Sequence, residues 1–308
     1  MRSFRYAHPP SLAEATHLLA EGGAGTAVLA GGTDLIVALR QGRQAPRLVI
    51  DIKGVAELRP PISVGGGWMR ISATTLMTAL RDDRAIRESF PALAEAAAVV
   101  GSVQIRNRAT LGGNICHASP AADTVPALLV YAAELELRSE SGTRRIALED
   151  FLVGPGQTAL RPGELLTHVA LRLPPLCPGA AFARLTRRRG VDLATINLAC
   201  GMDGAGTTRL AYGAVGPRAF VVSDGTGVLA DPRAAAADKE AILRQLLTRA
   251  SPISDVRASQ DYRAAMLRVL SLRTLRVCSD RLADATRCPA AAMALNGGSR
   301  ARRGSAGR

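Results

Sequence analysis

The sequence contains no two cysteines spaced closely enough to suggest a metal site. Its five cysteines stand at positions 116, 177, 200, 278 and 288, and none belongs to a Cys-x-x-Cys pair. Structural zinc sites and iron–sulfur clusters are usually built on such closely spaced ligands. We therefore predict no metal site in this chain. An odd number of scattered cysteines also indicates free thiols in a reducing compartment.

Aromatic residues make up only 3% of the chain, which argues against the nucleic-acid partner that a formal charge of +13 suggests. Proteins that bind single strands stack bases on aromatic side chains. No helix-turn-helix or zinc-finger pattern occurs either. Six arginines and one acidic residue lie in residues 281–308. We interpret the excess charge as a solvated, arginine-rich surface or a docking face for an acidic partner. A nonenzymatic basic scaffold or nucleic-acid-binding protein is the least favoured alternative.

No stretch approaches the roughly 20 apolar residues of a membrane-spanning helix, and residues 1–10 lack the apolar core of a secretory signal. We expect no membrane span and a cytoplasmic location. No arrangement of Ser, His and Asp suggests a nucleophile, so we predict no catalytic residue. With 308 residues and 47% hydrophobic content, the chain is long enough to bury a large core in two or three domains.

The sequence does contain a Gly-Gly pair between an apparent buried strand and a helix. Residues 28–30 indicate the end of the strand, and Gly31-Gly32 permits a turn that a Cβ would forbid. Asp34 can cap a helix with an apolar face at 35, 38 and 39. Such a turn places free N–H groups in one concavity, which typically binds a phosphate or pyrophosphate. A tight connection that binds nothing fits these residues equally well.

A second Gly-Gly pair favours the ligand-binding interpretation. Thr110-Leu-Gly-Gly-Asn114 predicts another Gly-Gly turn, which carries a hydroxyl on one side and an amide on the other. Asp123 follows nine residues later, just before an apolar run, 125–131, that indicates a helix. Neither pair fits the three-glycine dinucleotide fingerprint or the phosphate loop ending in Gly-Lys-Ser/Thr. We therefore expect neither a Rossmann nor a nucleoside-triphosphate site.

Together these segments resemble the FAD-binding subunit of the molybdenum hydroxylases, the family of carbon monoxide dehydrogenase and xanthine dehydrogenase. The resemblance runs in order from about Phe4 to Arg276. It is carried by residues 29–35, 104–114, 119–123, 213–216 and 259–263. It implies a noncovalently bound FAD on this chain.

The resemblance also implies which residues contact FAD. In the family the first pair holds the pyrophosphate through backbone amides, and the second lies along the ribityl chain and isoalloxazine. An acid matching Asp123 bonds the polar chain, some relatives have a lysine where Arg184 stands, and Leu193 matches a position that covers the flavin. The predicted site is Ala30, Gly31, Gly32, Thr33, Asp34, Leu35, Thr110, Gly112, Gly113, Asn114, Asp123, Arg184 and Leu193.

Simpler roles fit several of these residues. Asp123 could only cap the helix at 125–131, Thr110 could only cap a turn, and Leu193 could be a core strand residue. His117 is the only histidine expected near the cofactor.

The implied function is that of an electron relay in an oxidoreductase. A small partner subunit with [2Fe-2S] clusters would reduce the FAD, and an external acceptor would take the electrons. Substrate oxidation would occur at a molybdenum cofactor on a large partner subunit. The expected assembly is a heterotrimer, doubled into a dimer of heterotrimers. The alternative is a self-contained FAD-dependent oxidase or reductase of the same broad fold, with its own substrate pocket and base.

The expected fold class is α+β, with a two-part, PCMH-type FAD-binding domain followed by a C-terminal domain of antiparallel sheet plus helices. The predicted units are a small α/β subdomain at 1–58, a larger α+β subdomain at 59–175, an α+β domain at 176–280 and a disordered tail at 281–308. Pro174-Pro175 marks the main boundary.

Local patterns predict the main elements of these units. Ser11 begins a helix through a capping box, and Thr74 or Thr75 can cap a helix that runs through Leu80. Residues 91–100 form a nearly all-apolar helix that must be covered on most sides. The other expected helices are 234–250 and 259–277. The expected strands are 48–52, 65–72, 134–138, 143–148, 165–173, 181–186, 193–202 and 210–215.

Overall fold

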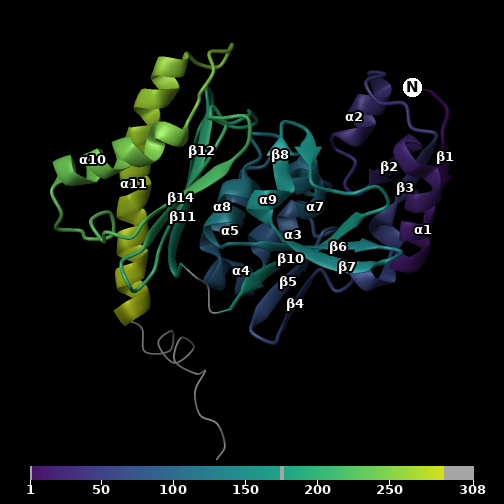
Figure 1. Cartoon of the computed structure of the whole chain (residues 1–308), viewed down its shortest axis with the longest axis horizontal. Helices are drawn as coiled ribbons and strands as arrows, with labels where there is room; N and C mark the ends of the chain where they lie inside the picture. The colour runs from purple at the N-terminus through teal and green to yellow at the C-terminus, as the bar shows by residue number, and fades with distance from the viewer. Residues whose placement is uncertain (1, 174–176, 288–308) are drawn as a thin grey trace, which may run out of the picture.

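The computed structural model describes residues 2–173 and 177–287. Its N-terminal part is a three-stranded parallel sheet in the order β1-β3-β2, flanked by two helices (Figure 1). Helix α1 begins as predicted, because the Ser11 hydroxyl accepts the Glu14 N–H. The elements are β1 (Arg5–Ala7), α1 (Leu12–Gly22), β2 (Thr26–Leu29), α2 (Leu35–Arg40) and β3 (Leu48–Asp51).

An antiparallel sheet in the order β4-β5-β10-β6-β7 forms the middle of the molecule. The predicted hairpin is confirmed, since β6 and β7 pair from Glu134 with Ala147 to Ser139 with Gly142. The strands are β4 (Ile62–Gly65), β5 (Trp68–Ser72), β6 (Glu134–Ser139), β7 (Gly142–Ala147) and β10 (Leu165–Arg172). A separate short pair is β8 (Leu152–Gly154) with β9 (Gln157–Thr158).

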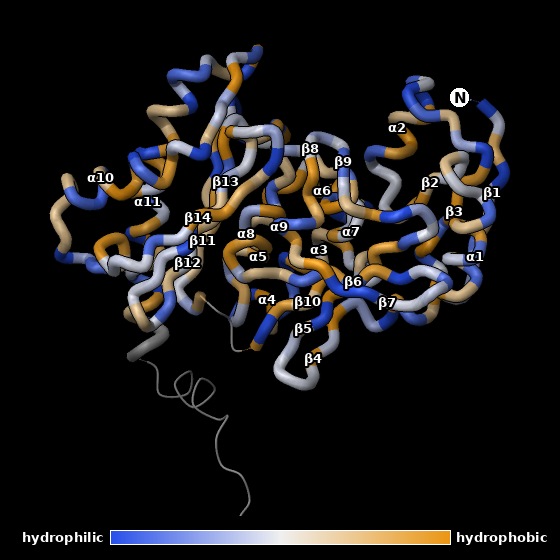
Figure 2. Tube along the Cα trace, in the orientation of Figure 1, coloured by the Kyte–Doolittle hydropathy of each residue, from blue (hydrophilic) through white to orange (hydrophobic). Residues whose placement is uncertain are grey.

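Helices beside this sheet build the largest hydrophobic core. The predicted apolar helix is confirmed as α5, whose Leu93, Ala96 and Ala97 are fully buried, and hydrophobic colours run along α5 and α8 in Figure 2. The helices are α3 (Met77–Asp82), α4 (Arg84–Ser89), α5 (Pro91–Ala98), α6 (Val103–Arg106), α7 (Leu111–Cys116), α8 (Thr124–Val130) and α9 (Leu148–Phe151).

The start of α3 differs from its prediction. The helix begins at Met77, and neither predicted threonine caps it. The Thr75 hydroxyl instead donates to the carbonyl of Pro61, and the Thr74 hydroxyl pairs with that of Ser72. Both threonines therefore stabilise the end of β5 rather than the helix.

The C-terminal part is an antiparallel meander, β11-β12-β13-β14, with both faces covered. Helix α11 packs against β11 and β12 on one face, while on the other face α5 packs against β11 and α8 packs mainly against β12 and β13 (Figure 1). The elements are β11 (Gly179–Leu185), β12 (Ile196–Met202), β13 (Thr208–Gly213), β14 (Phe220–Asp224), α10 (Ala236–Leu246) and α11 (Gln260–Arg287).

Two predictions need correction here. The strand expected at 193–202 begins only at Ile196, so Leu193 lies in the preceding loop. Helix α11 continues to Arg287, so residues 281–287 are helical where a disordered tail was predicted. The rest of that tail, 288–308, lies outside the described residues. We keep 1–58, 59–175 and 176–280 as proposed domain limits.

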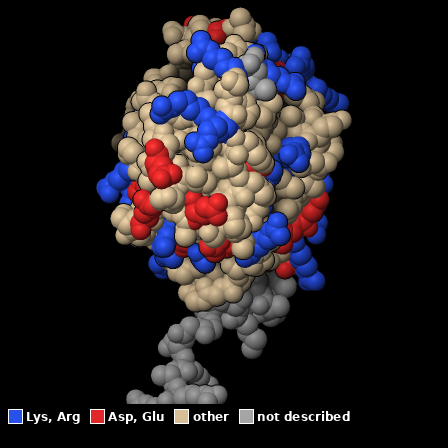
Figure 3. All heavy atoms as spheres, turned by 90° about the vertical axis from the view of Figure 1, so that its right-hand side faces the viewer, with Lys and Arg blue, Asp and Glu red and all other residues tan. Residues whose placement is uncertain are grey.

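Arginine side chains join the C-terminal part to the rest of the molecule. Arg209 donates to the carbonyls of Leu129 and Val130 at the end of α8, at 3.0 Å each. Arg218 donates to the carbonyl of Leu152 at 2.7 Å, and Arg281 pairs with Glu95. On the face of the molecule at the N-terminal end, basic and acidic side chains both occur (Figure 3). Several arginines therefore bond to other parts of the protein and are not merely solvated.

Candidate functional site

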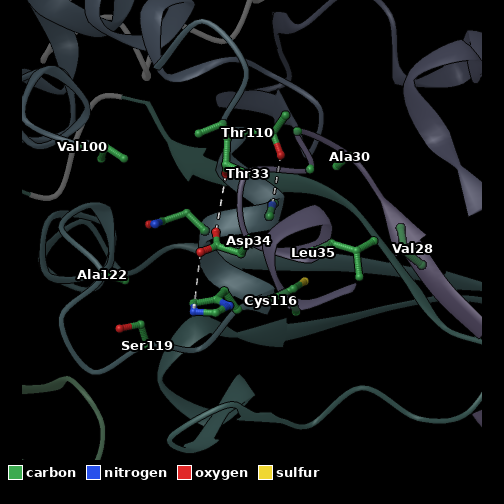
Figure 4. A pocket seen from close by; sticks show the side chains of 18 of the residues that line it. Val28, Ala30, Thr33, Asp34, Leu35, Val100, Thr110, Cys116, Ser119 and Ala122 are labelled. Carbon is green, nitrogen blue, oxygen red and sulfur yellow. Dashed lines mark hydrogen bonds and ion pairs between the residues drawn. The ribbon is translucent and has the colours of Figure 1, made fainter. Parts of the chain in front are cut away.

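A cavity of about 910 Å³ lies between two Gly-Gly segments and a loop of the C-terminal part. The first segment is residues 30–35, the second is residues 110–114, and the loop contains Arg188 and Leu193. This volume falls within the range of about 300–1,000 Å³ that is usual for small-molecule sites. Figure 4 shows the side chains around it. All but one of the predicted site residues line it: Ala30, Gly31, Gly32, Thr33, Asp34, Leu35, Thr110, Gly112, Gly113, Asn114, Asp123 and Leu193. Arg184 is the exception.

The first Gly-Gly segment offers unused backbone donors to the cavity. Within residues 2–173 and 177–287, no protein acceptor receives the N–H groups of Gly31, Gly32, Thr33 and Asp34. Gly32 has φ +77°, a conformation that side-chain-bearing residues rarely adopt. Consecutive free N–H groups in such a turn form a concavity that suits an anion. The first Gly-Gly turn therefore presents the free backbone donors that an anion-binding turn requires.

Gly31 is needed because the first Gly-Gly segment passes close to the backbone just before the second one. A Cβ built on Gly31 would lie 2.2 Å from the carbonyl oxygen of Arg108 and 3.0 Å from the Cα of Ala109. Backbone atoms of this kind cannot swing aside as a flexible side chain can. The close approach brings both segments to one cavity wall.

Lys53 forms a hydrogen bond to the first Gly-Gly segment and lies outside the cavity lining. The sequence did not predict this role. The Lys53 Nζ donates to the carbonyl of Ala30 at 3.1 Å and to the Asp51 carboxylate at 2.7 Å. Burial by itself raises the pKa of Asp51, but the hydrogen bonds from Lys53 and Tyr6 outweigh it and leave that pKa lowered. A signal was available, because Lys53 is one of only two lysines in an arginine-rich chain and follows a buried strand.

Asp34 does not cap α2 as predicted. It occupies the position before the helix, but its carboxylate accepts no N–H bond from the first turn. Instead it lies 3.5 Å from the Thr33 hydroxyl and 4.0 Å from Nε2 of His117 (Figure 4). Both Asp34 and His117 are more than half exposed. The pair bridges the two segments at the cavity mouth.

The second Gly-Gly pair is not a turn, which corrects the prediction. Gly112 and Gly113 lie inside α7, and the N–H groups there are already bonded. Leu111 and Gly112 donate to the carbonyls of Thr75 and Ala73, while Gly113 and Asn114 donate to the hydroxyl and carbonyl of Thr110. The Thr110 hydroxyl therefore caps a helix, α7, and not the turn that was considered as its simpler role. The N–H groups of residues 111–114 are therefore all engaged within the protein and are not available to an anion.

Small size explains Gly112, and a side chain supplies the polar contact nearby. A Cβ on Gly112 would lie 2.5 Å from that of Ala73, so the glycine lets α7 pack closely. The side-chain amide oxygen of Asn114, Oδ1, accepts a hydrogen bond from the Thr124 hydroxyl at 2.6 Å. Its amide nitrogen has no acceptor in the part of the chain that the structure describes, so it is available to a ligand.

Asp123 is fixed by two residues of the C-terminal part. One carboxylate oxygen accepts Nη1 of Arg184 at 2.9 Å, and the other accepts Nδ2 of Asn197 at 2.9 Å. Asp123 stands before α8 but makes no capping bond, so the simpler capping role is wrong. Burial raises the pKa of Asp123, an effect that Asn197 and Arg184 reduce but do not cancel. Asn197 was not recognised in the sequence.

Leu193 lies on the C-terminal side of the cavity. Leu193 is 54% exposed and lies in the loop before β12, so the prediction of a core strand residue is wrong. Val191 of the same loop is 51% exposed and also lines the cavity. These two side chains give one wall an apolar surface suited to a flat aromatic ring.

Comparisons with known proteins identify the family. The FAD binding domain in molybdopterin dehydrogenase matches residues 2–175, and the CO dehydrogenase flavoprotein C-terminal domain matches residues 180–277. The chain is 33% identical over 287 residues to the putative xanthine dehydrogenase FAD-binding subunit of Escherichia coli (strain K12), covering 91% of this chain and 96% of that relative. It is 30% identical over 286 residues to the carbon monoxide dehydrogenase medium chain of Hydrogenophaga pseudoflava, covering 91% and 98%.

Comparison with solved structures supports the same family. A chain of carbon monoxide dehydrogenase from Hydrogenophaga pseudoflava superposes with a TM-score of 0.82 at 29% identity, covering 91% of this chain and 98% of that one. For quinoline 2-oxidoreductase from Pseudomonas putida 86 the TM-score is 0.80 at 27% identity, with 91% and 99% covered. This chain therefore belongs to the family of FAD-binding flavoprotein subunits of the molybdopterin dehydrogenases.

Proposed function

We propose that the cavity binds one noncovalent FAD and that the chain is the FAD-binding electron-transfer subunit of a molybdenum hydroxylase. The observation that carries this proposal is the run of free N–H groups at residues 31–34 on the wall of a cavity of about 910 Å³. A pyrophosphate needs N–H donors and a close backbone approach. The glycines at 31 and 32 permit both.

The remaining lining residues fit the rest of the cofactor. Residues 30–35 would hold the pyrophosphate. The Asn114 amide and the Asp123 carboxylate would bond the hydroxyl-rich ribityl chain. Leu193 would cover the flavin ring. Thr110, Gly112 and Gly113 would act mainly by fixing α7 beside the cavity, as their bonds and packing indicate.

The bound flavin supplies a centre that accepts and donates electrons. The residues of this chain bind it, orient it and set the polarity around it. Because no two cysteines are spaced as a cluster requires, we infer that electrons arrive from another polypeptide. The relatives named above are subunits of larger dehydrogenases, such as a medium chain.

We further propose the specific partners. They are a large subunit with the molybdenum cofactor and a small subunit with [2Fe-2S] clusters, in a dimer of heterotrimers located in the cytoplasm. In the described residues, no helix is both long and apolar enough to cross a membrane. Cell fractionation tests the location, and the mass of the native complex tests the assembly.

The direct test is to purify the protein from its native source and to measure flavin, molybdenum and iron. We expect one FAD per chain, released by denaturation, together with molybdenum and iron from copurifying subunits. A colourless, folded protein that takes up no added FAD would contradict the binding site. An isolated, metal-free flavoprotein that turns over a substrate alone would instead support the self-contained oxidase or reductase.

A further inference from the structure

We propose that Arg184 and Asn197 are positioning residues that act on the cofactor through Asp123. Through them the C-terminal domain fixes the Asp123 carboxylate as an acceptor in the cavity wall of the FAD-binding domain. This inference rests on the proposed function, because it assigns a role within the same cavity. It differs from the direct contact that the sequence predicted for Arg184.

The geometry places Arg184 behind Asp123. Arg184 lies on β11 and is absent from the cavity lining, while Asp123 belongs to it. The side chains of Arg184 and Asp123 are 13% and 9% exposed. Each carboxylate oxygen accepts one bond from the C-terminal domain, at 2.9 Å in both cases. Since an ionised carboxylate has further lone pairs, Asp123 can still accept a ligand hydroxyl.

The orientation of Asn197 shows that donation to Asp123 dominates at this position. Its amide nitrogen donates to Asp123 and to the carbonyl of Ala121, whereas its buried Oδ1 has no partner among the described residues. Leaving a buried acceptor unpaired destabilises the folded chain. Turning the amide over would place its oxygen against two acceptors, which is worse. Such local costs are typical of functional sites.

Gly213 leaves space for the Asn197 side chain, and Arg263 bonds to the backbone near both residues. A Cβ on Gly213 would lie 2.1 Å from the Asn197 Oδ1, so the glycine makes room for that amide. Arg263, from the start of α11, is 2% exposed and donates to the carbonyls of Thr195 and Ala214. These carbonyls lie beside Asn197 and Gly213 in sequence. The segments 213–216 and 259–263 thus converge behind Asp123.

Few other charges act near this carboxylate. Arg184 is the charged partner that contacts it from the C-terminal sheet. The other charged or titratable cavity-lining side chains in the described residues are Asp34, Cys116, His117, Glu164, Arg188 and Asp192. Removing the Arg184 guanidinium therefore removes the main positive charge that opposes protonation of buried Asp123.

The test compares full-length FAD-stripped proteins by titration with FAD between pH 5.5 and 8. For Arg184→Gln we expect the affinity to fall about tenfold more than in the wild type as the pH is lowered, because loss of the guanidinium raises the pKa of buried Asp123 further and favours its neutral form. Arg184→Lys restores the wild-type pH profile, since a positive charge returns. The double variant Asp123→Asn/Arg184→Gln loses the added pH dependence.

Arg209→Gln is the matched control. Arg209 also joins the C-terminal domain to α8, but it holds carbonyls at the far end of that helix and lies outside the cavity lining. Its pH profile should match the wild type. If Arg184→Gln shows the same profile as Arg209→Gln while both bind FAD, Arg184 has only a structural role. A wild-type chain that binds no FAD at any pH would instead overturn the proposed function.

Discussion

The two Gly-Gly pairs look alike in sequence but use their glycines differently. At Gly31-Gly32 the backbone is left with N–H groups that no described residue accepts. At Gly112-Gly113 the N–H groups are bonded within the protein, and the glycines permit helix packing against Ala73 and Thr110. The same dipeptide thus provides ligand donors in one place and close packing in the other. The conformation and the hydrogen bonding of the backbone distinguish the two pairs.

Replacing Gly32 should have the largest effect on FAD binding. In Gly32→Val, a Cβ would lie 2.9 Å from the Leu29 side chain at a φ of +77°, so the anion-binding turn must change. We expect no measurable FAD uptake in a protein whose circular dichroism is unchanged. Gly42→Val is the control, because Gly42 has φ +70° with open space around it and lies outside the cavity lining. Normal affinity in folded Gly32→Val would remove this turn from the site.

Replacing Gly112 should affect stability first. In Gly112→Ala the new methyl would lie 2.5 Å from the Ala73 Cβ and 2.8 Å from its carbonyl oxygen. Overpacking of this kind costs about 1–3 kcal/mol. We expect a lower thermal midpoint in the FAD-free chain, while the fraction that stays folded binds FAD within a few-fold of the wild type. Complete loss of binding without loss of stability would make the two pairs equivalent and contradict the comparison.

Removing the anchor behind the first turn should weaken binding moderately. Lys53→Met keeps the length of the side chain but loses the bond to the Ala30 carbonyl. Because one such charge-assisted bond contributes about 1.5–3 kcal/mol, we expect FAD affinity to drop roughly tenfold or more. Isothermal titration measures this directly. Lys239→Met, in α10 and outside the cavity lining, is the control and should bind as the wild type does.

The smallest expected effect is on the acid stability of the N-terminal subdomain, through Asp51. The pKa of Asp51 is lower in the folded chain than its usual value. Its ionisation therefore favours folding above about pH 4, and this contribution is lost as the pH falls through the lowered pKa. Thermal melts between pH 7 and pH 3 should show a smaller acid-induced loss for Asp51→Asn than for the wild type. An equal loss in both proteins would mean that Asp51 does not contribute.

Local sequence signals predicted the parts of this molecule that depend on local physics. Ser11 and its following glutamate indicated a helix start, the apolar run at 91–98 required a buried helix, and both are present. The first Gly-Gly turn followed from glycine conformation and the strand before it. The family resemblance then placed twelve of the thirteen predicted residues around one cavity.

The predictions were wrong where contacts between segments far apart in the sequence determine the surroundings of a residue. Asp34 has the right type and place for a helix cap, but it lies near His117 instead. Asp123 pairs with Arg184, 61 residues later, and with Asn197, 74 residues later, contacts that no local pattern encodes. Leu193 looked like a strand residue because it is aliphatic and adjoins a strand, yet the ladder starts three residues later. Tertiary contacts override propensity in each case.

The central claim is that the N–H groups of residues 31–34 hold the FAD pyrophosphate. A structure of the FAD-loaded complex, determined by cryo-electron microscopy, tests it most directly. We predict pyrophosphate oxygens within hydrogen-bond distance, about 2.7–3.2 Å, of at least two of these backbone nitrogens. A pyrophosphate seated against residues 110–114, or away from both Gly-Gly segments, would contradict the account.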